Sequence, residues 1–270
     1  MTTDRKAVFI TGAASGIGLA TAKRFASAGW LVGLSDIDAP GLKTALAAIG
    51  GDNAGFTVVH DVRKADEWER ALDAFVEASG GRLDVLVNNA GICRYGWFTE
   101  QGPQDFDDQI DINLRGVILG AYLGHERLKR TPGSRLINIA SLASLTGSPR
   151  FAVYCATKFA VRGLSEALDI EFMRSGVRVS CVEPTVIETP LIDKASAPGG
   201  PSFREAVSGG GMNALPVEEA AEVVWRAAHE DALHYPVGDA PAALLLEINP
   251  RIEANRAHMK EAFAAAPAGA

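Results

Sequence analysis

Thr11-Gly12-Ala13-Ala14-Ser15-Gly16-Ile17-Gly18 follows a short apolar run and leads into a stretch with helical periodicity. Glycines allow the backbone to turn sharply and to approach a pyrophosphate, whose charge the free N–H groups of a helix N-terminus stabilise. The spacing G-x-x-x-G-x-G is only moderately specific, because a tight turn between a strand and a helix can use glycines without binding a ligand. Its position directly after the first predicted strand favours a nucleotide site. The candidate contacts are Gly12, Ser15, Gly16, Ile17 and Gly18.

Short apolar runs rich in β-branched residues alternate with longer amphipathic stretches along the chain. The predicted strands are Ala7–Thr11, Leu31–Ser35, Phe56–His60, Val85–Asn88, Arg135–Ala140, Val177–Val182 and a seventh near His234–Val237. The predicted helices are Ile17–Ala28, Gly41–Ile49, Ala65–Ala78, Phe106–Lys129, Ala152–Ser175, Pro216–His229 and Leu244–Phe263. This alternation predicts an α/β protein with a parallel sheet covered by helices on both faces.

Composition excludes several kinds of partner. The formal net charge is -7 and the basic residues are scattered, whereas nucleic-acid binding needs clustered Lys and Arg. No apolar run approaches the roughly 18 residues of a membrane-spanning helix, and no secretory signal is visible. Cys93, Cys155 and Cys181 lie far apart, and the histidines have no metal-ligand spacing. We therefore expect a cytoplasmic protein with no bound metal, no membrane segment and no nucleic-acid partner.

Asp36 ends the second predicted strand, at about the offset where an acidic side chain meets the adenosine ribose of a bound dinucleotide. A carboxylate accepts hydrogen bonds from both ribose hydroxyls but repels the 2′-phosphate of NADP. No Lys or Arg occurs in residues 12–18 or 34–40 to compensate. The sequence therefore predicts NAD as cofactor, with Asp36 and the neighbouring Ile37 as contacts. The alternative is that Asp36 merely caps the next helix.

Tyr154 and Lys158 stand four positions apart in a helical stretch, so their side chains emerge on one face. A tyrosine is a poor base near neutral pH, but an adjacent ammonium favours the phenolate. Ser141 ends the fifth predicted strand, where its hydroxyl can polarise a carbonyl oxygen. An isolated pair of this spacing would more simply be part of an amphipathic helix without function.

The motifs together resemble the short-chain dehydrogenase/reductase family. They are T-G-x-x-x-G-x-G, Asn88-Asn89-Ala90-Gly91, Asn113, Ser141 and Tyr154-x-x-x-Lys158, in order and spacing over residues 6–189. The resemblance implies a single doubly wound, Rossmann-type domain over residues 1–270, with a seven-stranded parallel sheet in the order 3-2-1-4-5-6-7. It also implies an NAD-dependent enzyme that interconverts a secondary alcohol and a ketone or aldehyde.

The resemblance assigns a role to each catalytic candidate. Tyr154 would be the general base for oxidation or the acid for reduction, and Lys158 would bind the nicotinamide ribose and lower the pKa of Tyr154. Ser141 would hydrogen-bond the reacting oxygen. Asn113 would hold a water that links Lys158 to solvent; the alternative for Asn113 is a helical residue bonded to nearby backbone.

Further cofactor contacts are also implied by the resemblance. They are Asp61 and Val62 at the adenine, Asn89, Ala90 and Gly91 beside the ribose, Tyr154 and Lys158 themselves, and Pro184, Ile187 and Thr189 facing the carboxamide. Thr185 departs from the family, which usually has glycine after this proline. That difference bears on the local backbone and the shape of the pocket.

The substrate is expected to be a small alcohol or carbonyl compound, moderately hydrophobic, because the candidate pocket positions are mostly apolar: Arg94, Tyr95, Leu142, Ala143, Thr185 and Val186. Residues 195–213, rich in Gly and Pro, are predicted to form a mobile substrate lid; the alternative is a plain surface loop. The resemblance implies a homo-oligomer, a tetramer or dimer, formed through helices 106–129 and 152–175. Two alternatives stay open: a non-catalytic dinucleotide-binding regulator, and a relative that epimerises or dehydrates nucleotide sugars.

Overall fold

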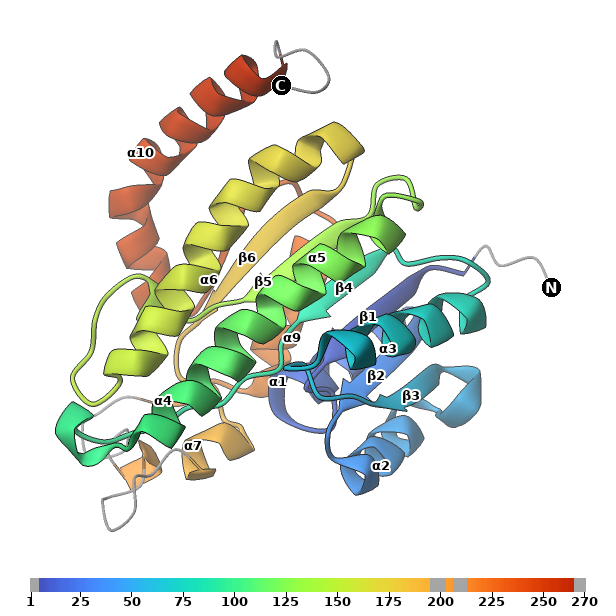
Figure 1. The fold of residues 1–270 in the computed structure, drawn as a ribbon, viewed down its shortest axis with the longest axis horizontal. Helices are drawn as coiled ribbons and strands as arrows, with labels where there is room; N and C mark the ends of the chain where they lie inside the picture. Colours follow the sequence, from blue (N-terminus) through green and yellow to red (C-terminus); the bar gives the residue numbers. More distant parts are fainter. Residues whose placement is uncertain (1–4, 195–202, 206–212, 265–270) are drawn as a thin grey trace.

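The computed structural model describes residues 5–194, 203–205 and 213–264, and these residues build an α/β fold around one sheet (Figure 1). All pairings between neighbouring strands are parallel. The seven strands lie in the order β3-β2-β1-β4-β5-β6-β7, so the predicted fold class is confirmed. The strands are β1 (Ala7–Thr11), β2 (Leu31–Asp36), β3 (Gly55–Val59), β4 (Val85–Asn88), β5 (Arg135–Ile139), β6 (Arg178–Pro184) and β7 (His234–Val237).

Helices cover both faces of this sheet, which explains why every residue of β1, β4 and β5 is buried. The helices are α1 (Gly16–Ser27), α2 (Ala39–Ile49), α3 (Ala65–Ala78), α4 (Pro103–Ile110), α5 (Gly116–Leu128), α6 (Ala152–Glu171), α7 (Pro190–Lys194), α9 (Val217–Ala227) and α10 (Asp239–Ala264). One apolar core joins the sheet to α1, α2 and α9, and a second joins it to α3 and α5. In Figure 1, α3, α5 and α6 lie in front of the sheet, with α1 and α9 behind it.

The predicted helix over residues 106–129 differs from the structure in one informative respect. The chain there forms α4, a π-helical segment Asp111–Arg115 and then α5, in direct succession. A π-helical turn inside an α-helix is rare and frequently marks a functional site. Here it contains Asn113.

The lid predicted for residues 195–213 falls mostly outside the described part of the chain. Phe203, Arg204 and Glu205 are described and are helical, so this part of the predicted loop is not irregular. The short helix α7, just before this region, was not predicted from the sequence. Among the described residues, no helix is long and apolar enough to cross a membrane.

The parallel arrangement places the carboxyl ends of all strands at one edge of the sheet. The glycine turn follows β1, Asp36 ends β2, Asn89 follows β4 and Ser141 lies two residues beyond β5. Ligands of open α/β sheets bind at this edge. The fold thus gathers the side chains that the sequence singled out.

Candidate functional site

The glycine turn lies directly against the loop after β4. Gly12 has φ +65° and Gly16 has φ +54°, in the left-handed region that favours glycine. A Cβ on Gly12 would lie 2.9 Å from the Ala90 Cα atom, and a Cβ on Gly16 would lie 3.2 Å from the methyl carbon of Thr189. Any larger residue at Gly12 would therefore push the two loops apart.

Asn89 fixes this contact with hydrogen bonds. Its side-chain nitrogen donates to the Thr11 carbonyl oxygen at 2.8 Å and to the Gly12 carbonyl oxygen at 3.2 Å. The Thr11 hydroxyl accepts in turn from the backbone N–H groups of Asn89 and Ala90, both at 3.0 Å. The turn and the loop are thus held as one rigid cradle.

The cradle fits a pyrophosphate. α1 begins at Gly16, and the Ser15 side chain makes no capping hydrogen bond to the helix, so the first N–H groups of the helix stay available for an anion. The first turn of α1 carries no acidic side chain that would repel one. A Cβ atom on Gly12 would clash with Ala90, and one on Gly18 would clash with the Gly12 carbonyl oxygen. The start of α1 therefore packs closely against the loop after β4.

Asp36 lies beside this turn. Its carboxylate accepts from the Ala14 N–H group at 3.1 Å and from the Asp38 N–H group at 3.1 Å. The residue whose side chain caps α2 is Asp38, which accepts from Gly41. Ile37 is 67% exposed at the rim. The interpretation of Asp36 as the helix cap is therefore wrong, because Asp38 has that role.

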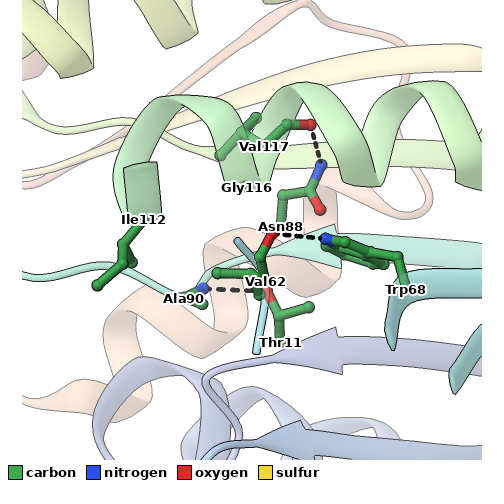
Figure 2. A pocket seen from close by; sticks show the side chains of 8 residues that line it. All are labelled: Thr11, Val62, Trp68, Asn88, Ala90, Ile112, Gly116 and Val117. Carbon is green, nitrogen blue, oxygen red and sulfur yellow. Dashed lines mark hydrogen bonds between the residues drawn. The ribbon is translucent and has the colours of Figure 1, made fainter. Parts of the chain in front are cut away.

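Val62 and Ala90 are predicted cofactor contacts that also line a narrow crevice under the cradle (Figure 2). The Trp68 indole donates to the Val62 carbonyl oxygen at 2.9 Å, and the Val62 side chain packs against Gly116. Next to Val62, the Asp61 carboxylate is bound by the Arg63 guanidinium at 2.7 Å, and this hydrogen bond lowers the pKa of Asp61. The lining residues are Thr11, Val62, Trp68, Asn88, Ala90, Ile112, Gly116 and Val117.

Tyr154 and Lys158 lie in the first two turns of α6, with the Lys158 ammonium nitrogen 5.7 Å from the centre of the phenol ring. Lys158 is 4% exposed, and its ammonium donates to the Ile139 carbonyl oxygen at 2.8 Å. A Cβ on Gly91 would lie 3.7 Å from the ammonium nitrogen and 3.3 Å from the Asn113 side-chain oxygen. Residues from the loop after β4, the π-helical segment and α6 thus converge on one point.

Burial controls the acidity of the central pair. It raises the pKa of the Tyr154 phenol above its usual range, the nearby Cys93 thiol adds to the rise, and a hydrogen bond with Ser141 opposes it. Burial also lowers the pKa of Lys158 to about 8. The net effect on Tyr154 is thus opposite to the fall in pKa expected from Lys158, because removal of the phenol from water is the largest contribution.

Asn113 is fully buried and bonds to backbone that is distant in sequence. Its side-chain oxygen accepts from the Ile92 N–H group at 2.8 Å, and its side-chain nitrogen donates to the Ile92 carbonyl oxygen at 2.8 Å. This pair of bonds ties the π-helical segment to the loop after β4. The alternative, in which Asn113 bonds only to nearby helical backbone, is therefore wrong. The bonds to Ile92 hold the Asn113 side-chain amide beside Gly91 and Lys158.

The segment after β6 also meets the glycine turn. Pro184 is the last residue of β6, Ile187 forms an isolated bridge with Leu215, and Thr189 packs against Gly16. Thr185, which replaces the glycine usual in the family, donates its N–H group to the Val237 carbonyl oxygen at 3.1 Å and does not have a positive φ. The substitution is accommodated because this position has backbone that any residue adopts.

One aromatic side chain beside Tyr154, that of Phe151, was missed at the sequence level. Phe151 lies 6.1 Å from Tyr154, 5.0 Å from Tyr95 and 4.9 Å from Phe203, measured between ring centres. Tyr95 was a pocket candidate and Phe203 lies within the predicted lid, whereas Phe151 was not singled out. Phe151 immediately precedes the helix that carries Tyr154, a position that could have indicated it.

A buried polar cluster, also missed, lies behind the site between β6, β7 and α6. Cys181, Glu183 and His234 place potential metal-ligand atoms within 4.8 Å of one another. The His234 Nδ1 atom lies 2.6 Å from the Glu183 carboxylate, which also accepts from the Tyr235 N–H group at 3.1 Å. Burial alone would lower the pKa of His234, but hydrogen bonds and charges from Glu166 and Glu183 raise it to about 9. The cluster is therefore a buried ion pair.

Comparison with known proteins agrees with this geometry. A family model described as short chain dehydrogenase matches residues 6–198. D-threitol dehydrogenase of Mycolicibacterium smegmatis is 37% identical over 234 residues, which are 85% of this chain and 88% of that protein.

Solved structures show the same fold. A short-chain dehydrogenase/reductase of Burkholderia phymatum in complex with NAD has a TM-score of 0.81 at 26% identity, covering 95% of this chain and 97% of that chain. An alcohol dehydrogenase of the archaeon Thermococcus sibiricus complexed with 5-hydroxy-NADP has a TM-score of 0.74 at 27% identity, covering 86% and 96%. Because the family model and the aligned relative both span most of the sequence, the chain belongs to the short-chain dehydrogenase/reductase family of oxidoreductases.

Proposed function

We propose that the protein is an NAD-dependent oxidoreductase that interconverts a secondary alcohol and a ketone or aldehyde. One observation carries the proposal: the buried Lys158 ammonium lies beside Gly91, on the loop that packs against the glycine turn, and the Tyr154 phenol lies next to that ammonium. This arrangement supports an acid–base role for Tyr154 next to a bound dinucleotide.

In this proposal Tyr154 exchanges a proton with the substrate oxygen. During oxidation the phenolate takes the hydroxyl proton while the carbinol carbon–hydrogen bond breaks; during reduction the phenol returns the proton. The Ser141 hydroxyl, which is hydrogen-bonded with Tyr154, holds the substrate oxygen in the same place. A bound nicotinamide accepts or supplies the hydride.

Lys158 and Asn113 support Tyr154. The ammonium donates to Ile139 with one of its three N–H groups, which leaves donors for the ribose hydroxyls. With a pKa lowered to about 8, Lys158 can also release a proton near neutral pH. Asn113, tied to the Ile92 backbone, is proposed to hold a water beside Lys158 that connects it to solvent.

The remaining proposed cofactor contacts follow the edge of the sheet. Gly12, Ser15, Gly16, Ile17 and Gly18 would take the pyrophosphate, and Asp36 and Ile37 the adenosine ribose. Asp61 and Val62 would contact the adenine, Asn89, Ala90 and Gly91 the adjoining ribose, and Pro184, Ile187 and Thr189 the carboxamide. The three cysteines are free and buried, which supports a reducing, cytoplasmic compartment.

Replacing Asp36 with alanine is expected to lower kcat/KM for NAD by about tenfold or more, because hydrogen bonds to a charged acceptor are lost. The value for NADP should rise as the repulsion disappears. Steady-state kinetics with both cofactors measures the ratio. Asp38→Ala is the matched control, since it removes the neighbouring carboxylate that caps α2. An unchanged ratio in Asp36→Ala would show that this carboxylate does not contact the ribose.

Incubation of the pure protein with NAD and a panel of secondary alcohols tests the proposal, with absorbance of reduced nicotinamide as the readout. We expect formation of reduced nicotinamide with at least one alcohol. NAD binding without turnover on any alcohol or ketone would favour the dinucleotide-binding regulator. Conversion of a nucleotide sugar without net reduction of NAD would favour the epimerase or dehydratase alternative.

We also propose a homo-oligomer formed through α5 and α6. Apolar side chains are exposed on both helices: Ile118 is 43%, Tyr122 is 73% and Phe159 is 42% exposed. Sedimentation should therefore find a dimer or tetramer, and Ile118→Glu combined with Tyr122→Glu should give monomers. Leu246→Glu on α10, where the leucine is 79% exposed, is the control that should keep the assembly. A monomeric wild-type protein would contradict this interface.

A further inference from the structure

An aromatic wall lies beside the Tyr154 phenol. We use this name for Tyr95, Phe151 and Phe203, which pack with ring centres 4.9 to 5.5 Å apart. They come from the loop after β4, the residue before α6 and the segment after α7. The rings are tilted or edge-on to one another and together form an apolar surface, against which another ring can pack.

Arg150 borders this wall in an unusual conformation. Its φ is 70°, and among the described residues it is the only one other than glycine with a positive φ. Strained backbone of this kind concentrates at functional sites. The Arg150 carbonyl oxygen accepts from the Gly96 N–H group at 3.1 Å, which holds the strained turn in place.

The Arg150 guanidinium is fixed by aromatic rings. It donates to the Tyr95 hydroxyl at 3.0 Å, and its central carbon lies 4.7 Å from the centre of the Trp97 ring and 5.5 Å from that of Tyr95. A guanidinium has five N–H donors. Among the described residues, the Arg150 guanidinium donates a hydrogen bond to the Tyr95 hydroxyl alone. This bond fixes the position of the guanidinium, and most of its N–H donors stay available.

Nearby arginines are already neutralised. Arg94 pairs with Asp105 at 3.2 Å and with Asp108 at 3.6 Å. Arg204, one residue after Phe203, pairs with Glu188 and Asp193. Within the described ranges, no carboxylate lies within 4.0 Å of the Arg150 guanidinium, in contrast to both neighbours. The positive charge next to the aromatic wall is therefore available to an anion.

We propose that the substrate is a cyclic or aromatic secondary alcohol that also carries a carboxylate, with its ring on the aromatic wall and its carboxylate on Arg150. This rests on the function proposed above and names the substrate class of the same site. The planar guanidinium matches a carboxylate in a two-point hydrogen bond. A phosphate monoester, with a charge of about -1.5 to -2, would leave charge unbalanced by a single arginine. The carboxylate itself is unchanged in the reaction.

Kinetics with matched substrates tests this assignment. The positional isomers of hydroxycyclohexanecarboxylate are compared with their methyl esters, which keep the ring and remove the charge. For the best isomer, wild-type kcat/KM should favour the carboxylate by about tenfold or more, the value expected for hydrogen bonds between charged groups. Arg150→Gln should remove this preference and Arg150→Lys should keep part of it. Arg70→Gln, on α3 and paired with Asp66, should keep all of it.

Binding provides a readout that does not need turnover. Titration calorimetry with cyclohexanecarboxylate, which has no hydroxyl to oxidise, should give a Kd about tenfold weaker or more in Arg150→Gln than in wild type. Arg150→Gly should weaken binding equally yet raise the unfolding midpoint, because glycine adopts a positive φ without strain. If Arg150→Gly lowered the unfolding midpoint and left the Kd for cyclohexanecarboxylate unchanged, Arg150 would only stabilise the loop.

The two proposals fail in different ways. If no alcohol or ketone reacts with any nicotinamide cofactor, the proposed function is wrong. If neutral cyclic alcohols react but the ester and carboxylate are used equally, and Arg150→Gln binds cyclohexanecarboxylate as wild type does, only the anionic substrate class is wrong.

Discussion

Tyr154→Phe is expected to lower kcat for alcohol oxidation by about a thousandfold, because positioned acid–base groups contribute about 10² to 10⁴. The phenylalanine ring keeps the packing against Phe151 and removes only the hydroxyl. The affinity for NAD should therefore stay nearly unchanged. Stopped-flow or steady-state measurement of reduced nicotinamide gives the rate, and calorimetry gives the affinity.

The control for this change is Tyr122→Phe, which removes a hydroxyl from an exposed tyrosine on α5. It should turn over at the wild-type rate. Because burial raises the pKa of Tyr154, wild-type oxidation should also accelerate as the pH rises above neutrality, and the residual rate of Tyr154→Phe should lack this rise. Wild-type turnover in Tyr154→Phe would remove this residue from the mechanism.

His234→Ala is expected to destabilise the fold by about 3 to 5 kcal/mol, because it leaves the Glu183 carboxylate buried without its partner. Glu183 is fully buried and His234 is 7% exposed. The double variant His234→Ala with Glu183→Ala should recover part of the loss, since no unpaired charge remains. Urea unfolding gives the free energies. His258→Ala on the exposed face of α10 is the control.

The same ion pair makes stability depend on pH. Folding raises the pKa of His234 from 6.5 to about 9, so its contribution is complete below pH 6.5 and is lost as the pH rises through about 9. Each pKa unit corresponds to about 1.36 kcal/mol, which gives about 3 kcal/mol in total. The difference in free energy of unfolding between wild type and His234→Ala should therefore become smaller as the pH rises from 6.5 through about 9. A difference that grows or stays constant with pH would mean that His234 is not the charged partner.

Local chemistry explains why so much of the fold was predictable. β1, β4, β7 and α3 have the predicted bounds, because apolar runs of strand length stand between glycines and helix-forming stretches. The glycine turn could also be predicted from the sequence, because a positive φ and a close backbone contact both favour glycine. These features depend on residues that are neighbours in the chain.

What was missed depends on tertiary contacts. The Glu183 and His234 pair exists because the β6 and β7 register sets Cys181 beside His234, and nothing in either strand alone indicates that partner. The Asn113 side chain in the π-helical turn is hydrogen-bonded to the Ile92 backbone, 21 residues away in the sequence. The pKa of Tyr154 was expected to fall because of Lys158 four residues away, but burial raises it, and the extent of burial is a property of the folded site.

Transfer of isotope from substrate to cofactor tests hydride exchange at this site most directly. A secondary alcohol with deuterium on its carbinol carbon, chosen from those that the protein oxidises, is incubated with NAD, and the reduced cofactor is analysed by mass spectrometry. We predict one deuterium in the nicotinamide of each reduced cofactor, with a rate that falls in Tyr154→Phe. Reduced cofactor without deuterium, or no reduction with any alcohol, would contradict the account.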